Sequence, residues 1–311
     1  MRRVTALPPP PLPSESVVRR LSLQVARRLD GLLQGEHLGF LPGPGSEPAE
    51  ARPYDLGDDV RRIDWSVTAR TGETHVRTTV SERELETTIL LDLTGSMAFG
   101  TRTSEKRDLA ISVCAAVLHL ARGAGDRTGA VLLTPSGAKR IPPRAGRDAV
   151  LATLHTVLHE PRADGAGPPL STALQGLLVP PRRRGLVVVI SDLLEAADQW
   201  QRPLALVGQR HDTMVVEVLD PRELSLPDVG TLRLVDPESG REVDVATTKA
   251  VRERYAAAAG ARRQANAVAV RAAGASHVVL RTDSDWLVDF ASFLQHRKRT
   301  RGSAARARAQ R

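Results

Sequence analysis

Residues 87–100 read TTILLDLTGSMAFG and join a short apolar run to a polar turn. The apolar run ends in Asp92, and Thr94 and Ser96 follow it at two-residue spacing. A second stretch of the same form, GLVVVISDLLE at 185–195, leads into Asp192. Short, nearly continuous apolar runs are typical of strands that are buried on both faces of a parallel sheet. The two stretches therefore predict core strands that each end at a carboxylate.

From residue 85 onward, strand and helix patterns alternate over about 200 residues. Strands are predicted at 88–91, 130–133, 186–190, 214–219 and 277–280, with helical periodicity between them. This alternation predicts an α/β fold built on a doubly wound, mostly parallel sheet. The sequence VLLTPSGAKRIP at 131–142 indicates a hairpin, which adds one antiparallel edge strand. A second hairpin is predicted at 231–245, before a long helix that begins near residue 248.

Composition divides the chain into four parts. Residues 1–15 are proline-rich and predicted to be disordered, 16–84 hold an amphipathic helix and a charged segment, 85–296 form the α/β domain, and 297–311 are a basic, disordered tail. The tail holds seven of the 44 basic residues and none of the 36 acidic ones, so the rest of the chain carries a formal charge of only +1. We therefore expect no specific nucleic-acid binding, whereas the tail offers a contact for anionic surfaces.

The single cysteine, Cys114, lies in an apolar helical pattern. One cysteine excludes a disulfide scaffold and a thiolate metal cluster, and a buried, inert thiol is the expected state. The N-terminal residues contain no apolar core of a signal peptide, and no apolar run is long enough to span a bilayer. These features predict a cytoplasmic protein.

The polar residues at the strand ends predict a metal site. Ligands of open parallel sheets collect outside the carboxyl ends of the strands, where Asp92 and Asp192 are expected to face one another. With Thr94 and Ser96 they supply hard oxygen ligands of the kind that suit magnesium. The alternative is structural, because the same residue types cap the first turn of a helix.

Two patterns resemble known families. Asp92-Leu93-Thr94-Gly95-Ser96 resembles the D-x-S-x-S motif of von Willebrand factor A domains, with Thr94 in the place of a serine. The upstream stretch RPYDLGDDVRRIDWSVTAR, residues 52–70, is similar to the signature of the bacterial domain of unknown function 58, which precedes an A-like domain. The positions that match are Arg52, Tyr54, Gly57, Asp58, Arg61, Ile63, Asp64, Trp65, Ala69 and Arg70. The similarity covers residues 39–294, nearly everything except the two ends.

The resemblance implies a metal-ion-dependent adhesion site and a non-enzymatic role. In such a site two hydroxyls, a further threonine and a second aspartate surround a divalent ion. In the run GAGPPLSTALQGLL at 165–178, Pro168 stands where that threonine is expected, so magnesium is expected to be held weakly or not at all. The partner that the family implies is an AAA ATPase of the MoxR group, for which this chain would be an adaptor or chaperone cofactor.

The charged signature segment allows two interpretations. It combines acidic and basic residues with two of the nine aromatic residues of the chain, Tyr54 and Trp65. An arginine–carboxylate network around an anchored Trp65 would hold the segment against the main domain, and we favour this structural role. A docking surface for a partner is the alternative, because arginine and aromatic residues are common interface anchors.

A phosphoryl-transfer enzyme is the competing function. The sequence DLTGS also resembles the D-K-T-G-T loop of P-type pumps and the haloacid-dehalogenase group, in which the aspartate equivalent to Asp92 is phosphorylated. Leu93 replaces the lysine of that loop, no acidic pair follows Ile190, and Lys139 is placed in the edge hairpin. His155 and His159 lack the adjacent glutamate of a zinc-protease motif, so they indicate a solvated helix face.

Overall fold

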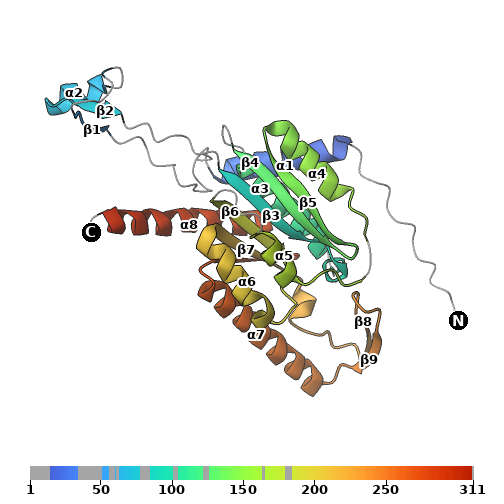
Figure 1. The fold of residues 1–311 in the computed structure, drawn as a ribbon. Helices are drawn as coiled ribbons and strands as arrows, with labels where there is room; N and C mark the ends of the chain where they lie inside the picture. Colours follow the sequence, from blue (N-terminus) through green and yellow to red (C-terminus); the bar gives the residue numbers. More distant parts are fainter. Residues whose placement is uncertain are drawn as a thin grey trace.

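The computed structural model describes residues 15–33, 51–55, 60, 63–77, 85–100, 104–121, 126–162, 165–178 and 184–309. A six-stranded sheet in the order β10-β7-β6-β3-β4-β5 forms the centre of the molecule (Figure 1). Its strands are β3 (Glu86–Asp92), β4 (Arg127–Thr134), β5 (Gly137–Ala145), β6 (Gly185–Ser191), β7 (Asp212–Leu219) and β10 (Ser276–Arg281). All neighbours pair in parallel except β4 and β5, which are antiparallel. The predicted doubly wound, mostly parallel sheet with one antiparallel edge strand is confirmed.

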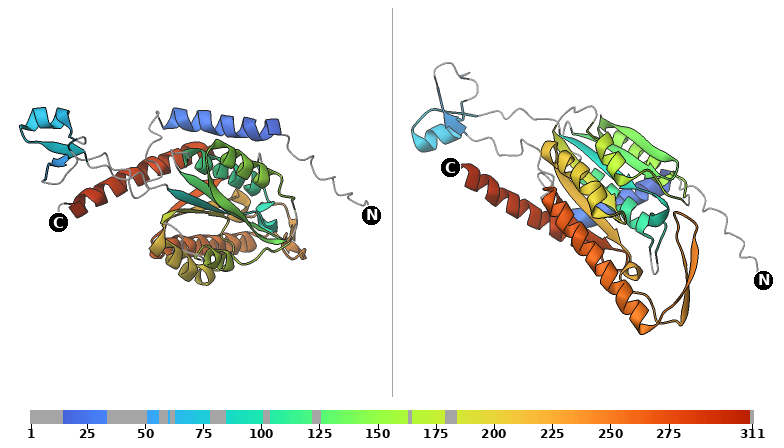
Figure 2. Two further views of the ribbon diagram at one scale, coloured as in Figure 1. Left: turned by 45° about the horizontal axis from the view of Figure 1, so that its top comes forward. Right: turned by 60° about the horizontal axis from the view of Figure 1, so that its bottom comes forward.

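Helices cover both faces of this sheet. One face carries α1 (Glu15–Leu32), α3 (Lys106–Leu120), α4 (Arg147–Leu158) and α8 (Trp286–Ala309). The other face carries α5 (Leu170–Gly176), α6 (Ala197–Arg210) and α7 (Lys249–Ala272). Figure 2 shows α1 on the side of the sheet opposite to α6 and α7.

The strands are apolar throughout because both of their faces are buried. In β3, Ile89 and Leu91 point into the core beneath α3, whereas Leu90 between them points into the core beneath α6. All three side chains are 0% exposed, as the two-residue period of a strand requires for a central position. Cys114 on α3 is also fully buried, as predicted, and burial raises the pKa of its thiol to about 12.

The predicted amphipathic helix at 16–34 is α1. Its apolar stripe, Val25, Leu29 and Leu33, is buried in the core cluster that also holds α3 and α8. Its polar side is tied down by Asp30, which is 2.8 Å from Nε2 of His119, and by Arg28, which pairs with Asp285. The helix before the signature segment is therefore an integral layer of the α/β unit.

The signature segment forms a small unit of its own, with β1 (Ala51–Pro53), α2 (Trp65–Thr71) and β2 (His75–Arg77). The strands β1 and β2 pair in antiparallel, Asp64 caps α2, and Figure 1 shows the three elements apart from the main sheet. The predicted anchoring of Trp65 is wrong, because this residue is 71% exposed. A helix of seven residues without a buried side chain has no core in which to place an indole. Gly57, Asp58 and Arg61 lie outside the described residues.

The C-terminal part differs from the prediction at one boundary. The helix α8 runs to Ala309 and so continues through the segment predicted as a disordered tail. Arg297, the first residue of that segment, is only 4% exposed and donates hydrogen bonds to Asp212 Oδ1 at 2.8 Å and Ser276 Oγ at 3.0 Å. These partners lie on β7 and β10, so Arg297 belongs to the folded domain. The prediction for residues 1–14 falls outside the described part of the chain.

The predicted second hairpin is formed by β8 (Thr231–Val235) and β9 (Glu242–Ala246). Two short 3-10 helices, η2 (Gly95–Met97) and η3 (Pro221–Glu223), follow the ends of β3 and β7. None of the helices in the described residues combines the length and the apolar character needed to cross a membrane.

Candidate functional site

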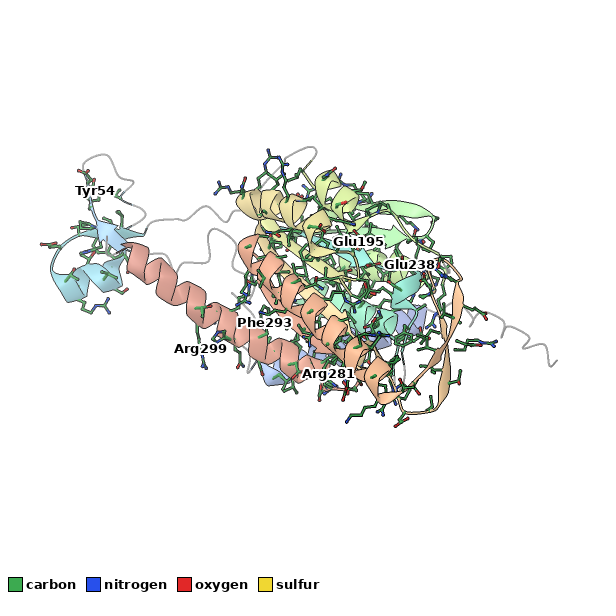
Figure 3. The ribbon with its side chains drawn as sticks, turned by 90° about the horizontal axis from the view of Figure 1, so that it is seen from below. Tyr54, Glu195, Glu238, Arg281, Phe293 and Arg299 are labelled. Atoms are coloured by element: carbon green, nitrogen blue, oxygen red, sulfur yellow. The ribbon has the colours of Figure 1, made fainter. Side chains whose placement is uncertain are left out.

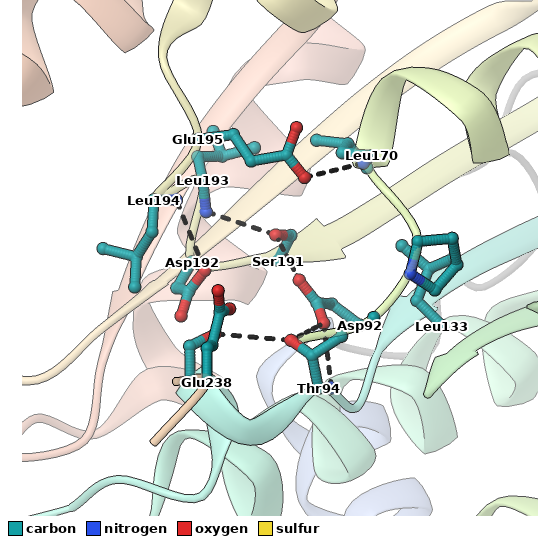
Figure 4. Close-up of a pocket in the computed structure, with 13 residues that line it drawn as sticks. Asp92, Thr94, Leu133, Leu170, Ser191, Asp192, Leu193, Leu194, Glu195 and Glu238 are labelled. Atoms are coloured by element: carbon teal, nitrogen blue, oxygen red, sulfur yellow. Dashed lines mark hydrogen bonds between the residues drawn. The ribbon is translucent and has the colours of Figure 1, made fainter. Parts of the chain in front are cut away.

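Asp92 and Asp192 come together at the carboxyl ends of two neighbouring strands. Asp92 is the last residue of β3, and Asp192 directly follows β6. Both are buried, at 7% and 5% exposed, and both line one cleft together with Thr94 and Ser96 (Figure 4). The strand register explains the meeting, because Leu91 pairs with Ile190 and the next residues along are Asp92 and Ser191. All four residues predicted for the metal site thus share one small cleft of about 60 Å³.

The Asp92 carboxylate accepts three hydrogen bonds. Its Oδ1 accepts from the Thr94 backbone N–H at 3.1 Å and from Thr94 Oγ1 at 2.7 Å, and its Oδ2 accepts from Ser191 Oγ at 2.8 Å. The hydroxyls of Thr94 and Ser96 are 3.3 Å apart. Thr94 occupies the N-cap position of η2 without capping it through its side chain. Its hydroxyl is therefore directed to the cleft rather than to the helix end.

The electrostatic environment disfavours the charged form of Asp92. Burial is the largest cause and the nearby Asp192 the next, and together they raise the pKa of Asp92 from 3.8 to about 6. The hydrogen bonds from Thr94 and Ser191 act in the opposite direction and do not cancel the effect. A buried carboxyl group with a raised pKa is characteristic of functional sites, where a cation or a partner offsets the cost of its negative charge.

Lys106 completes the site and was missed by sequence reasoning. It is the first residue of α3 and is 0% exposed. Its Nζ donates to Asp192 Oδ2 at 2.7 Å and to Glu223 Oε1 at 2.5 Å. Burial lowers the pKa of this ammonium, but the two carboxylates outweigh burial and the pKa lies above 10.5. The sequence did contain one indication of this role, because a lysine is unfavourable at the N-terminal end of a helix, where the helix dipole is positive.

The loop that follows Asp192 is strained. Leu193 is the only described non-glycine residue with a positive φ, 51°. Its backbone is held from both sides, because its N–H donates to Ser191 Oγ and its carbonyl accepts from the Asn266 side chain. A left-handed branched residue is costly and is found mostly where the surrounding structure fixes a functional turn.

Two loops close the opposite side of the cleft. The loop before α5 brings Gly167 and Pro168 to the lining, and a Cβ on Gly167 would lie 2.5 Å from Thr94 Cγ2. Pro168 lines the same cleft as the two hydroxyls, at the place where the resemblance to A domains implies a threonine, and it offers no side-chain ligand. Thr172, the next threonine after Pro168 in the sequence, lies within α5 and is not among the lining residues.

The tip of the β8–β9 hairpin supplies a further acid that sequence reasoning did not identify. Pro237 O accepts from Gly165 N–H at 2.9 Å, which fixes the tip against the loop before α5. Figure 4 shows the Glu238 carboxylate beside that of Asp192, and Figure 3 shows Glu195 and Glu238 on the same side of the domain. Burial, and then Asp192, raise the pKa of Glu238. Only the folded chain brings these distant residues together.

The oxygen donors fit a weakly held divalent ion. Asp92, Thr94 and Ser96 present carboxylate and hydroxyl oxygens, the ligand type of magnesium. Asp192 is less available, because its Oδ2 accepts from Lys106, while its Oδ1 accepts only a long bond of 3.4 Å from the Leu194 N–H. No group of three or more His, Cys, Asp or Glu residues with metal-binding geometry occurs among the described residues, so the hydroxyls are essential to such a site.

Apart from Asp92, the residues considered for catalysis lie elsewhere. Lys139 is on the edge strand β5, its side chain is 54% exposed, and it pairs with Glu160. The ring of His155 on α4 stacks on that of His159, the residue that caps the C-terminal end of α4, with 3.8 Å between the ring centroids. His159 Nδ1 also forms a hydrogen bond with the His155 carbonyl oxygen. Neither group lines the cleft at Asp92.

A comparison with family models matches residues 50–265 to "Protein of unknown function DUF58". Among curated proteins, an uncharacterized protein of Mycobacterium tuberculosis is 45% identical over 285 residues, which are 91% of this chain and 90% of the relative. An uncharacterized protein of Mycobacterium avium is 41% identical over 161 residues, which are 51% of this chain and 95% of that protein.

A search of solved structures gives matches at low sequence identity. The conserved hypothetical protein BatB from Bacteroides thetaiotaomicron matches with a TM-score of 0.42 and 13% identity, over 68% of this chain and 98% of its own. The VWA domain of SpRpn10 matches with a TM-score of 0.39 and 11% identity, over 67% of this chain and 93% of its own. The fold assignment rests on the strand order and pairing described above, and the family assignment rests on the sequence matches.

Proposed function

Because this chain belongs to the DUF58 family, a family of proteins of unknown function, we propose that it is a non-enzymatic protein-interaction module. The observation that supports this most strongly is the convergence of Asp92, Thr94, Ser96 and Asp192 in one cleft at the strand ends. The cleft holds oxygen ligands and a strained loop, and the described residues that line it include neither a histidine nor a cysteine.

We further propose that a magnesium-type ion in this cleft mediates recognition. The hydroxyls of Thr94 and Ser96 and the carboxylate of Asp92 would hold it, and Asp192 would contribute through its second oxygen. A bound divalent ion supplies an open coordination position for an acidic side chain of a partner. The protein contributes the fixed positions of the donors, which Ser191 and the Thr94 backbone N–H maintain through their bonds to Asp92.

The partner that fits this proposal is an AAA ATPase of the MoxR group, with the present chain as its adaptor or chaperone cofactor in the cytoplasm. Support for the partner comes from the resemblance of the signature segment and the strand-end motif to the family pattern. The small unit of β1, α2 and β2 exposes Trp65, which would give the ATPase a second contact away from the cleft.

A pull-down tests the proposal. Full-length protein is immobilised and offered the purified ATPase in buffer that contains magnesium or EDTA, with Asp92→Ala and the exposed-site control Glu253→Gln in parallel. We expect capture in magnesium, loss of capture in EDTA and with Asp92→Ala, and normal capture with the control. Equal capture under all four conditions would contradict a role for the cleft.

The phosphoryl-transfer alternative is tested with the wild type and the Asp92→Ala variant, without the ATPase. They are incubated with acetyl phosphate and with p-nitrophenyl phosphate in magnesium. The adaptor proposal expects no hydrolysis above background. Hydrolysis by the wild type that disappears in Asp92→Ala would replace the adaptor proposal with an enzyme.

A further inference from the structure

Lys106 places a permanent positive charge of the protein at the strand-end cleft. Its side chain is buried, and its Nζ lies 2.7 Å from Asp192 Oδ2 and 2.5 Å from Glu223 Oε1. A buried ammonium is stable only where carboxylates compensate it, and here two of them do. One of these two is the second aspartate of the proposed metal site.

The ammonium is held by a rigid set of hydrogen bonds. Glu223 Oε2 accepts from the Asp220 backbone N–H at 3.0 Å, and Asp220 Oδ2 accepts from Thr282 Oγ1 at 2.7 Å. These bonds link Lys106 on α3 to the segments that follow β6, β7 and β10. The Lys106 backbone N–H also donates to the Phe99 carbonyl at 2.8 Å. The cation is therefore a fixed part of the strand ends and not an exchangeable counter-ion.

The position of Lys106 is unfavourable for the helix that carries it. It begins α3, where the helix dipole is positive and favours acidic side chains. The next residue, Arg107, is also buried, but its guanidinium donates to the carbonyls of Leu93 and Glu160. Of these two residues, only Lys106 donates hydrogen bonds to carboxylates. Its interaction with Asp192 and Glu223 therefore offsets the unfavourable position of its charge at the start of the helix.

We propose that Lys106 is the resident cation of the cleft and competes with divalent cations for Asp192. The ammonium occupies one oxygen of Asp192 and repels a second positive charge nearby. The cleft accordingly keeps its geometry without a metal, binds divalent ions weakly, and depends more on Asp92 than on Asp192 for that binding. This inference rests on the proposed function only in taking the cleft as the place where a divalent ion binds.

Calorimetric titration of the full chain with Mn²⁺ tests the inference. The variants are Lys106→Met, which keeps the length of the side chain and removes its charge, and Lys139→Met, which removes an exposed lysine from β5 as a matched control. Removing the ammonium that shares Asp192 with the proposed ion is expected to tighten Mn²⁺ binding at least about tenfold. The control is expected to bind like the wild type.

Thermal unfolding gives a second reading of the same effect. In EDTA, Lys106→Met leaves Asp192 and Glu223 without their cation, and its melting temperature is expected to fall. Mn²⁺ should raise the melting temperature of Lys106→Met by more than it raises that of the wild type. A ligand that binds only the folded state stabilises it more when it binds more tightly. If Lys106→Met does not fold, Lys106→Gln removes the same charge while keeping a hydrogen-bond donor.

The outcomes separate this inference from the proposed function. A Lys106→Met protein that is destabilised equally with and without Mn²⁺, or that binds Mn²⁺ no better than the wild type, would overturn the competition. A wild type that already binds Mn²⁺ at micromolar concentration would overturn it as well. Neither result depends on the ATPase, whose capture in the pull-down tests the interaction role by itself.

Discussion

Replacing Asp92 by asparagine should stabilise the metal-free protein. The change removes a buried charge next to Asp192 and keeps an oxygen that can accept from the Thr94 N–H and hydroxyl. On the other side of the carboxylate, Ser191 Oγ can accept from the new amide instead of donating. The shape of the site is preserved, so the effect reports the cost of the charge.

The magnitude follows from the pKa of Asp92. A pKa of about 6 in the folded protein, against 3.8 in a free side chain, means that ionisation costs the folded state about 3 kcal/mol. The cost is absent below pH 3.8, where the carboxyl is protonated in both states, grows as the pH rises to about 6, and is complete above that value. Because the new amide recovers only part of the hydrogen bonding, we expect a gain of about 1–3 kcal/mol near neutral pH.

Urea unfolding in EDTA, followed by circular dichroism across this pH range, measures the gain. The titration of distant groups contributes equally to both proteins, so it cancels in the difference between the unfolding free energies of the wild type and Asp92→Asn. Glu253→Gln on the exposed side of α7 serves as the control and should change the free energy of unfolding by less than about 0.5 kcal/mol at every pH. A variant less stable than the wild type at neutral pH, or a difference that does not grow with pH, would refute the reasoning.

Three further predictions concern the scaffold. Leu29→Ala on α1 removes a side chain that is 0% exposed and should cost about 2–5 kcal/mol of unfolding free energy in urea, whereas exposed Leu23→Ala should cost little. Cys114, whose pKa burial raises to about 12, should not react with Ellman's reagent until the protein is unfolded. Trp65→Ala should leave the unfolding free energy within about 0.5 kcal/mol, since the indole is 71% exposed; a larger loss would mean that it packs.

The sequence was sufficient to predict the sheet because both faces of its strands are buried. Runs such as 186–190 are apolar without interruption, which few other structures allow, and they place Asp92 and Asp192 at strand ends. Parallel pairing then brings those ends to one edge of the sheet. The fold and the convergence of the four polar residues could therefore be predicted.

The rest of the site depends on contacts between distant segments. Lys106 and Glu223 are 117 positions apart, and the Glu238 loop reaches the cleft only through the placement of a whole hairpin. Periodicity within one element contains no information about such partners. Trp65 was misjudged for a related reason, because charged and aromatic residues close in sequence suggest a network, while seven helical residues and two short strands cannot bury it.

The affinity of the ATPase for the two-hydroxyl variant Thr94→Val, Ser96→Ala tests the central claim most directly. Calorimetry in magnesium would compare it with the wild type after circular dichroism has shown equal folding. The account predicts that the wild type binds and that the variant loses at least about tenfold in affinity, because the hydroxyls are the direct ligands of the proposed ion. Unchanged affinity in a correctly folded variant would show that the strand-end cleft is not the recognition site.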